Sequence, residues 1–517
     1  METLTINKTD RWRSSQRLTH KTKPVDILLI YPGPKSKRPK TPFSILALGS
    51  WIKKHGYSVK LLDQRVEDVD WDQIKSAKLI GISSMTGSQL SAAVPLAKEI
   101  KVIAPETPII WGGPHVSFFP EKSCESDFVD YVVEAEGEPV IIELMKKLLA
   151  GEEPENVAGV TFKNKNGEMI HNEKPPMIDM ELLDLPLYDM VDLSLYSDVL
   201  TGFSYESSRG CPYPCTFCYV YTFHDRTFRA KSPEKVLREV KLLKEKYGFE
   251  RLFFTEDFMW VQKERSLKIF KLFAEHNLNL KWNAFCRADF LSKLNEEEMD
   301  IIAKGGAEIL TLGLETGSER MLKYIKKHIT MEQAKNAIQK CVKHNIITTS
   351  SFIIGMPTEL PEDVEETIKM YETLTSFSDS VEINGFFIYT PYPGVPLYDV
   401  ALQHGYQKME RLEDWYRWGY SDPTMNKWLT PEYSHRLETL SIIVRFRYLY
   451  HRFQYYTKFS AEYKNEKLNS PLLRLAYDIL TPILFAISNF RLKHRFFSMG
   501  YEWRLWRLFI NKRFNVG

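Results

Sequence analysis

The sequence predicts an α/β protein that has two successive units of alternating strands and helices and a helical C-terminal extension. Short apolar runs alternate with helical patterns over residues 25–150, and six such repeats follow over residues 200–402. Strands separated by helices of this length form right-handed crossovers on a parallel sheet. The 517 residues, 44% of them apolar, are enough to fill several cores, which excludes a disordered chain.

The first unit, residues 25–150, is predicted to be a doubly wound parallel sheet. Its strand-like runs include "VDILLIYPG", "AKLIGISSMT", "TPIIWGGPHV" and "DYVVEAEGE". Such sheets bind ligands at the carboxyl ends of their strands, and Gly112 and Gly113 allow a close backbone approach there. Residues 151–199 are predicted to be a hairpin, with its turn at Asn166-Gly167, and a linker, whereas the polar residues 1–24 are expected to be a mobile tail.

Six β/α repeats in residues 200–402 are too few for a complete eight-stranded barrel. They predict a partial barrel that is open on one side to a large substrate. The basic, aromatic-rich residues 403–517 are predicted to form a helical domain, and Trp415 and Trp418 are expected to begin a lid over the barrel mouth.

Three of the six cysteines, Cys211, Cys215 and Cys218, lie on one predicted loop directly after a strand. Three thiolates at this spacing can bind three corners of a cubane iron–sulfur cluster and leave one iron free. A zinc site with His224 as its fourth ligand is the alternative. The widely spaced Cys124, Cys286 and Cys341 are expected to be buried hydrophobic residues, with an auxiliary cluster as their alternative. This cysteine usage favours a reducing compartment, so the expected location is the cytoplasm.

The cysteine triad resembles the signature of radical S-adenosylmethionine (SAM) enzymes, and the resemblance continues over residues 200 to about 400. It implies a 4Fe-4S cluster whose open iron binds SAM, a 5′-deoxyadenosyl radical, and an external electron donor of the flavodoxin or ferredoxin type. Glu256 resembles the residue that contacts the SAM ammonium, although "TED" replaces the Gly-Gly-Glu of many members. Glu315 resembles the ribose contact, with an ordinary ion pair as the alternative for Glu315 and for Asp257. The implied SAM-binding residues are Tyr219, Glu256, Arg287, Glu315, Gly355 and Pro357.

The first unit resembles the cobalamin-binding, Rossmann- or flavodoxin-like domain that precedes the barrel in the B12-dependent branch of this family. The resemblance rests on the order of "YPGP", "GISSMTGSQ", "WGGPHV" and "VVEAEGEP". No Asp-x-His-x-x-Gly motif is present, and His20, His55 and His115 do not fit one, so cobalamin would lack an axial histidine. A degenerate domain that binds no cobalamin is the alternative. The implied cobalamin-binding residues are Pro32, Ser83, Ser84, Met85, Thr86, Gly112, Gly113, His115, Glu136, Gly137 and Glu138.

Two reactions fit this resemblance to class B radical SAM methyltransferases and to the anaerobic Mg-protoporphyrin cyclase. Methylation of an unactivated carbon of a hydrophobic or lipid-like substrate is favoured by analogy, because it is the commoner activity in the branch. Oxidative cyclisation or carbon coupling without methyl transfer is the alternative. The resemblance disfavours a methylthiotransferase, because those relatives carry three further cluster cysteines in the N-terminal domain, whereas here only Cys124 precedes residue 200. A non-catalytic cobalamin or metal sensor is a further alternative, and no catalytic residue for the substrate is identified.

Residues 441–517 hold 14 Lys and Arg but only 4 Asp and Glu, interleaved with aromatic residues. The most apolar stretch, residues 476–490, is shorter than the roughly 20 residues of a membrane span. A solvated helical subdomain and a peripheral contact with the inner membrane surface are both consistent with this pattern. The substrate is accordingly expected to be a lipid-like molecule or a planar or anionic metabolite, and nucleic acid is not the expected partner.

Overall fold

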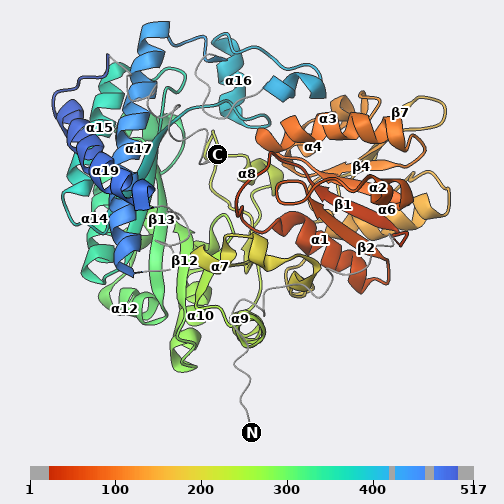
Figure 1. Ribbon diagram of the computed structural model, residues 1–517, viewed down its shortest axis with the longest axis horizontal. Coiled ribbons are helices and arrows are strands. Elements are labelled where there is room, and N and C mark those ends of the chain that lie inside the picture. The colour runs from red at the N-terminus through yellow and green to blue at the C-terminus, as the bar shows by residue number, and fades with distance from the viewer. Residues whose placement is uncertain (1–22, 418–424, 460–470, 499–517) are drawn as a thin grey trace.

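The computed structural model describes residues 23–417, 425–459 and 471–498. Two α/β units lie side by side, and the C-terminal helices α17 (Pro431–Phe459) and α19 (Pro471–Lys493) lie on the side of the second unit that faces away from the first (Figure 1). The predicted fold class, a parallel-sheet domain followed by a partial barrel and a helical extension, is confirmed.

The first unit is built on a seven-stranded sheet in the order β2-β1-β3-β4-β5-β6-β7. The first five strands are parallel, and the hairpin formed by the last two extends the sheet in the antiparallel sense. The strands are β1 (Ile27–Tyr31), β2 (Val59–Asp63), β3 (Leu79–Ser83), β4 (Ile109–Gly112), β5 (Tyr131–Val133), β6 (Val160–Lys163) and β7 (Met169–His171).

Alternating side chains of β1 explain why helices cover both faces of this sheet. Ile27 and Leu29 pack in one core with α1 (Phe43–Lys54) and α6 (Glu138–Leu149). Leu28 and Ile30 point to the other face and pack with α2 (Trp71–Ser76) and α3 (Ser88–Ile103). A strand buried on both faces must be apolar throughout, as "ILLI" is. Two short helices, α4 (Pro114–Phe118) and α5 (Pro120–Cys124), join β4 to β5.

The second unit is a sheet of six parallel strands in sequence order, as predicted for a partial barrel. Its strands are β8 (Phe203–Tyr205), β11 (Arg251–Phe254), β12 (Lys281–Cys286), β13 (Ala307–Glu315), β14 (Ile347–Ile354) and β15 (Val381–Ile388). The connecting helices are α9 (Pro233–Tyr247), α10 (Lys263–Glu275), α11 (Ala288–Lys293), α12 (Glu296–Lys304), α13 (Glu319–Tyr324), α14 (Met331–Lys343) and α15 (Pro361–Thr375). Capping boxes at Asn295 and Thr330 begin α12 and α14.

Several short helices and strands lie in the linker between the two units and in the segments that follow β8 and β11. The linker carries η2 (Tyr188–Met190), η3 (Leu193–Leu195) and α7 (Asp198–Thr201). Beyond β8, the pair β9 (Ser208–Arg209) and β10 (Arg229–Ala230) brackets a loop and α8 (Val220–Phe223), and η4 (Met259–Val261) follows β11.

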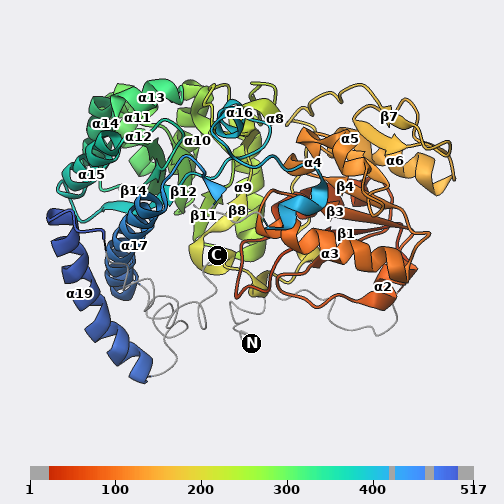
Figure 2. The same cartoon turned by 90° about the horizontal axis from the view of Figure 1, so that it is seen from above.

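After the last strand the chain first returns to the first unit and then runs along the barrel. Helix α16 (Pro396–Gln403) leads to η5 (Leu412–Arg417), and this part of the chain returns to the first unit (Figure 2). In η5 the buried Trp415 packs in the same core as α3. Trp415 therefore packs on the first unit, which differs from the expected lid over the barrel mouth, and Trp418 lies outside the described residues. Helix α17 then packs on β15 through Leu437, Leu440 and Val444. Within the described residues, no helix is long and apolar enough to cross a membrane.

Trp282 on β12 lies at the centre of the barrel core. Its ring stacks on Phe270 at 3.9 Å between centroids, and its indole N–H donates to the Gly305 carbonyl over 2.8 Å. Trp282→Ala should lower the free energy of unfolding by about 3–5 kcal/mol, because the cavity cannot collapse fully. Urea unfolding will measure this change. Leu242→Ala, at an exposed position on α9, should change it by less than about 0.5 kcal/mol, and equal losses would contradict the assignment.

Candidate active site

A cavity of about 390 Å³ lies where the carboxyl ends of the two sheets meet. Its wall combines loops after β3, β4 and β5 of the first unit with loops after β8 and β11 of the second. Several residues expected at the cofactors line it: Ser83, Met85, Gly112, Gly113, Glu136, Gly137, Glu138, Tyr219 and Glu256. Residues assigned to two different cofactors therefore share one wall.

Four residues expected at cobalamin, namely Pro32, Ser84, Thr86 and His115, do not line this cavity. His115 is 1% exposed and its Nδ1 lies 2.8 Å from the Thr86 hydroxyl. The Trp415 ring covers it at 4.9 Å between centroids, and burial lowers the pKa of His115 to about 3. Ser84 is also turned inward, and its hydroxyl donates to the Gly112 carbonyl.

The first unit's part of the wall suits a large planar cofactor. Gly112 and Gly113 end β4 without side chains, and a Cβ at Gly113 would meet the Ser84 carbonyl oxygen at 2.5 Å. Behind them the wall is apolar, with Leu29, Ile110 and Ile141 in the space between the sheet and α1 and α6. Exposed backbone above an apolar slot fits cobalamin, so the residues present agree with that group.

The cysteine loop begins at Gly210, where a positive φ of 85° and the Thr227 carbonyl leave no room for a side chain. The Thr216 N–H donates to the Ile325 carbonyl over 3.0 Å and fixes the loop to the barrel. Burial raises the pKa of Cys211 and raises that of Cys218 to about 12. A buried thiolate at either position needs a positive partner, and iron supplies one, so three thiols on one loop fit a cubane with an open iron.

The contacts of His224 differ from those of a zinc ligand in the cysteine loop. Its Nδ1 lies 3.6 Å from Glu136 and within 3.1 Å of the Arg229 guanidinium. Among the described residues, no three His, Cys, Asp or Glu side chains gather as ligands of a single metal ion. Cys124, Cys286 and Cys341 are buried and free, as predicted.

Arg287 connects the cysteine loop to the barrel. Its guanidinium stacks on Tyr213 at 3.6 Å and lies 3.9 Å from the Cys215 sulfur. Asp289 and the Lys327 carbonyl accept its other hydrogen bonds. A cation held this close stabilises negative charge on the sulfur, which favours a cluster-bound thiolate.

Glu256 lines the cavity, and one of its carboxylate oxygens has no hydrogen-bond partner. The Ser207 hydroxyl donates to Oε1 over 2.5 Å, whereas the buried Oε2 has no partner. Burial raises the pKa of Glu256 to about 7 and that of the adjacent Asp257 to about 6. An unpaired buried carboxylate oxygen fits an ammonium ligand, which is what the SAM assignment of Glu256 requires.

The other residues expected at SAM follow the next strands. Glu315 ends β13 with a positive φ of 66° and forms a buried ion pair with Lys327 at 2.7 Å. The ion-pair alternative for Glu315 is thus present in this structure. Gly355, with φ at 77°, and Pro357 follow β14, and the Gly355 carbonyl accepts the Trp428 indole N–H over 3.0 Å.

The two units are joined beside the cavity by buried ion pairs that sequence reasoning missed. Arg209 contacts Glu206 at 2.9 Å, Glu138 at 2.8 Å and Glu136 at 3.5 Å. Arg229 donates twice to Glu136, over 2.7 and 2.9 Å. Glu136 and Glu138, which were expected at cobalamin and line the cavity, also pair with these arginines of the second unit. In the sequence, Arg209 stands out only by its position two residues before Cys211. This position does not reveal which carboxylates Arg209 contacts.

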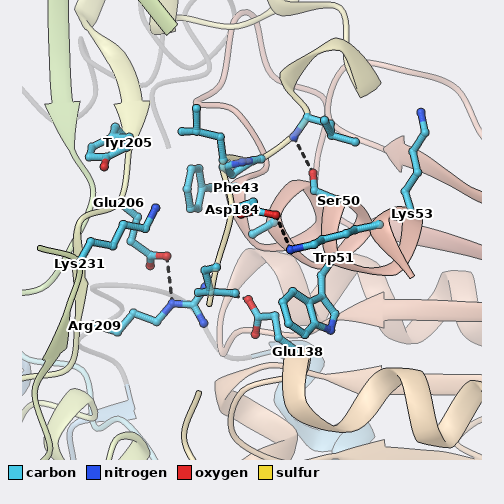
Figure 3. A pocket seen from close by; sticks show the side chains of 16 residues that line it. Phe43, Ser50, Trp51, Lys53, Glu138, Asp184, Tyr205, Glu206, Arg209 and Lys231 are labelled. Atoms are coloured by element: carbon cyan, nitrogen blue, oxygen red, sulfur yellow. Dashed lines mark hydrogen bonds and ion pairs between the residues drawn. The ribbon is translucent and has the colours of Figure 1, made fainter. Parts of the chain in front are cut away.

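A second cavity, of about 300 Å³, shares part of its lining with the first, and Figure 3 shows the residues that line it. Phe43, Ala47, Glu138, Glu206 and Arg209 line both cavities, so one layer of side chains separates them. Its remaining wall comes mostly from α1 and the linker. The apolar part consists of Trp51, Leu183, Leu185, Pro186 and Leu187, and the charged side chains at its edge are Lys53, Lys54, Asp184 and Lys231.

Comparison with known families agrees with this division of the chain. Residues 36–145 match the B12 binding domain, and residues 205–371 match the radical SAM superfamily. Among solved structures, the cobalamin-dependent SAM radical enzyme OxsB, with aqua-cobalamin and SAM bound, is 16% identical and superposes with a TM-score of 0.66. That superposition covers 98% of this chain and 80% of the other.

Sequence relatives include methyltransferases and cyclases. An uncharacterised methyltransferase of Pyrococcus horikoshii is 30% identical over 419 residues, which cover 78% of this chain and 88% of that protein. The anaerobic magnesium-protoporphyrin IX monomethyl ester cyclase of Rubrivivax gelatinosus is 24% identical over 68% of this chain and 64% of that protein. The hopanoid C-3 methylase of Methylococcus capsulatus is 23% identical over 68% and 67%.

These matches and the shared cavity give the same assignment. Enzymes of the radical SAM superfamily act on small molecules and take electrons from an external donor. The chain belongs to the cobalamin-dependent radical SAM methyltransferases, which use a 4Fe-4S cluster, SAM and cobalamin.

Proposed function

We propose that this enzyme methylates an unactivated carbon of a hydrophobic or lipid-like small molecule. The observation that carries the proposal is the single cavity whose wall joins Gly112 and Gly137 of the first unit to Tyr219 and Glu256 of the second. When bound, the cluster and SAM supply the hydrogen-abstracting radical, and cobalamin supplies the methyl group. A substrate carbon placed in this cavity lies within reach of both.

The chain's own residues hold and orient the reacting groups in this proposal. Cys211, Cys215 and Cys218 bind the cluster, and Arg287 beside Cys215 stabilises its charge. Glu256 receives the SAM ammonium on its unpaired oxygen. Tyr219, Glu315, Gly355 and Pro357 are the further proposed SAM contacts. The proposed cobalamin contacts are those expected residues that line the cavity: Ser83, Met85, Gly112, Gly113, Glu136, Gly137 and Glu138.

The second cavity is the proposed route of the substrate to the reacting carbon. The apolar part of its wall, formed by Trp51 and the linker residues, suits the hydrophobic portion of a molecule that also carries polar groups, and the layer with Arg209 and Glu138 separates this cavity from the cofactor cavity. The hopanoid methylase among the relatives acts on a lipid by name, which supports a lipid-like substrate here. A lipid-like substrate in turn favours peripheral membrane contact through the C-terminal region. The electron donor, of the flavodoxin or ferredoxin type, would then approach from the aqueous side, opposite the membrane.

Oxidative cyclisation without methyl transfer is the second candidate, because the relatives include the anaerobic cyclase. The two candidates differ in their SAM products. Methyl transfer consumes one SAM for the methyl group and one for the radical, so S-adenosylhomocysteine and 5′-deoxyadenosine are both formed. Cyclisation gives 5′-deoxyadenosine alone.

The reconstituted enzyme, incubated anaerobically with SAM, reductant, cobalamin and extracted cell lipids, should therefore form both products in about equal amounts. Mass spectrometry will quantify them. Cys215→Ala should abolish both products and the brown colour of the cluster, whereas Cys341→Ala, a buried cysteine on α14, should retain them. 5′-Deoxyadenosine that increases on addition of the lipid extract, without S-adenosylhomocysteine, would support cyclisation, and neither product from the brown wild-type protein would refute both candidates.

The SAM affinity of the reconstituted enzyme should rise with pH through the pKa of Glu256, about 7. Below this pH the carboxyl group is neutral, and above it the carboxylate can bind the ammonium, so the affinity should increase by about tenfold from about pH 6 to about pH 8. Anaerobic titration calorimetry measures it. Glu256→Gln should remove most of this increase, whereas Asp257→Asn should preserve it. The same slope in wild type and Glu256→Gln would show that Glu256 does not bind the ammonium.

Leu185→Asp should weaken substrate binding, because it places a charge in the apolar wall of the second cavity. KM for lipid extract should rise by about tenfold or more, while substrate-free cleavage of SAM stays unchanged. The matched control is Leu182→Asp, three residues earlier and exposed outside the cavity. Equal KM values for the two variants would exclude this route for the substrate.

A further inference from the structure

Helix α19 exposes a row of large apolar side chains on one face. Ile479, Ile483, Ile487 and Phe490 are 52%, 50%, 41% and 60% exposed. Their spacing of four, four and three residues places them above one another along the helix. The other exposed large apolar residues of the described chain, such as Val102 and Leu242, lie on separate elements. Scattered residues of this kind are ordinary, whereas a continuous row marks a surface that is covered by something apolar.

The row is not part of the contacts that hold α19 on the protein. The Phe485 ring stacks on Tyr450 of α17 at 4.4 Å between centroids. Just beyond the helix, the Arg495 guanidinium pairs with Glu365 and Glu372 of α15. Ser488 and Leu492 are buried on the inner side. Figure 2 shows α19 at the outer edge of the molecule, on the far side of the barrel from the first unit.

The charges around the row identify the chemistry of its partner. Residues 479–490 include no charged side chain, and Arg474 and Asp478 precede them. The exposed Lys493 follows them, whereas Arg491 is buried and donates to the Phe496 carbonyl. The last 77 residues have 14 Lys and Arg against 4 Asp and Glu. An apolar strip flanked by cations matches an anionic lipid surface, where acyl chains receive the strip and headgroups receive the cations. An apolar protein partner would match the strip but not the excess of cations.

We propose that α19 is an interfacial helix that binds this enzyme to an anionic lipid bilayer. The helix lies parallel to the surface, with Ile479, Ile483, Ile487 and Phe490 among the upper parts of the acyl chains. Pro482 in its middle and the absence of a spanning helix among the described residues agree with lying on the bilayer. The inference adds to the proposed function the surface that contacts the lipid bilayer. It does not depend on the identity of the substrate.

Co-sedimentation of the full chain with vesicles tests this surface. The wild type should bind vesicles of phosphatidylcholine with phosphatidylglycerol at low salt, and it should bind much less at high salt or to phosphatidylcholine alone. Ile483→Glu should lower the bound fraction at least about tenfold, because the charge opposes insertion. Val102→Glu, at an even more exposed apolar position on α3, is the matched control and should bind like the wild type.

Three outcomes would overturn the proposal: no binding by the wild type, equal binding by Ile483→Glu, or binding to neutral vesicles that salt does not weaken. Light scattering without lipid tests whether a second copy of this chain covers the row instead. A wild-type dimer that Ile483→Glu converts to a monomer would make the row a protein interface. Ile483→Glu should form 5′-deoxyadenosine from SAM at the wild-type rate. Loss of vesicle binding is therefore distinguishable from failure of the proposed chemistry, which would remove SAM cleavage from both proteins.

Discussion

The geometry of the shared cavity depends on the buried ion pairs of Arg209 and Arg229 with Glu136 and Glu138. Burial alone would raise the pKa of Glu136, but the two arginines hold it below its ordinary value. Burying these charges costs desolvation free energy, which close partners of opposite charge offset. Removing one partner therefore leaves the remaining charges buried and unpaired. Because the arginines flank the cysteine loop and the glutamates follow β5, these contacts set the position of one sheet's loops relative to the other's.

The same region gives the cavity an uneven electrostatic lining. On the barrel side, burial raises the pKa of Glu206, Glu256 and Asp257, because it disfavours the charged form of these three carboxyl groups. A cationic ligand that enters beside them lowers this cost by pairing with them. On the opposite side the wall combines glycines and aliphatic residues, which suit a large neutral ring, with Glu136 and Glu138, which are paired with the arginines.

Much of the fold could be predicted because it rests on local patterns. The alternation of apolar runs and helices gave both sheets, and the spacing of Cys211, Cys215 and Cys218 indicated the cluster loop without knowledge of the fold. The contacts of Glu138 and His115 could not be predicted in the same way. Arg209 is 71 residues from Glu138, and Trp415 is 300 residues from His115, so neither pair leaves a periodic signal in the chain. Such contacts arise only after the two units have met.

The packing of Trp415 has a consequence for how the molecule can open. The chain crosses from the first unit to the second through the linker before β8 and comes back at η5, where Trp415 is buried against the first unit. Two separate regions therefore connect the units: the linker before β8 and the packing of Trp415 in η5. A motion that separates them widely has to pull an indole ring out of its core in addition to breaking the arginine contacts. A ligand that enters or leaves only when the two units separate widely therefore has to displace Trp415 as well as break the ion pairs.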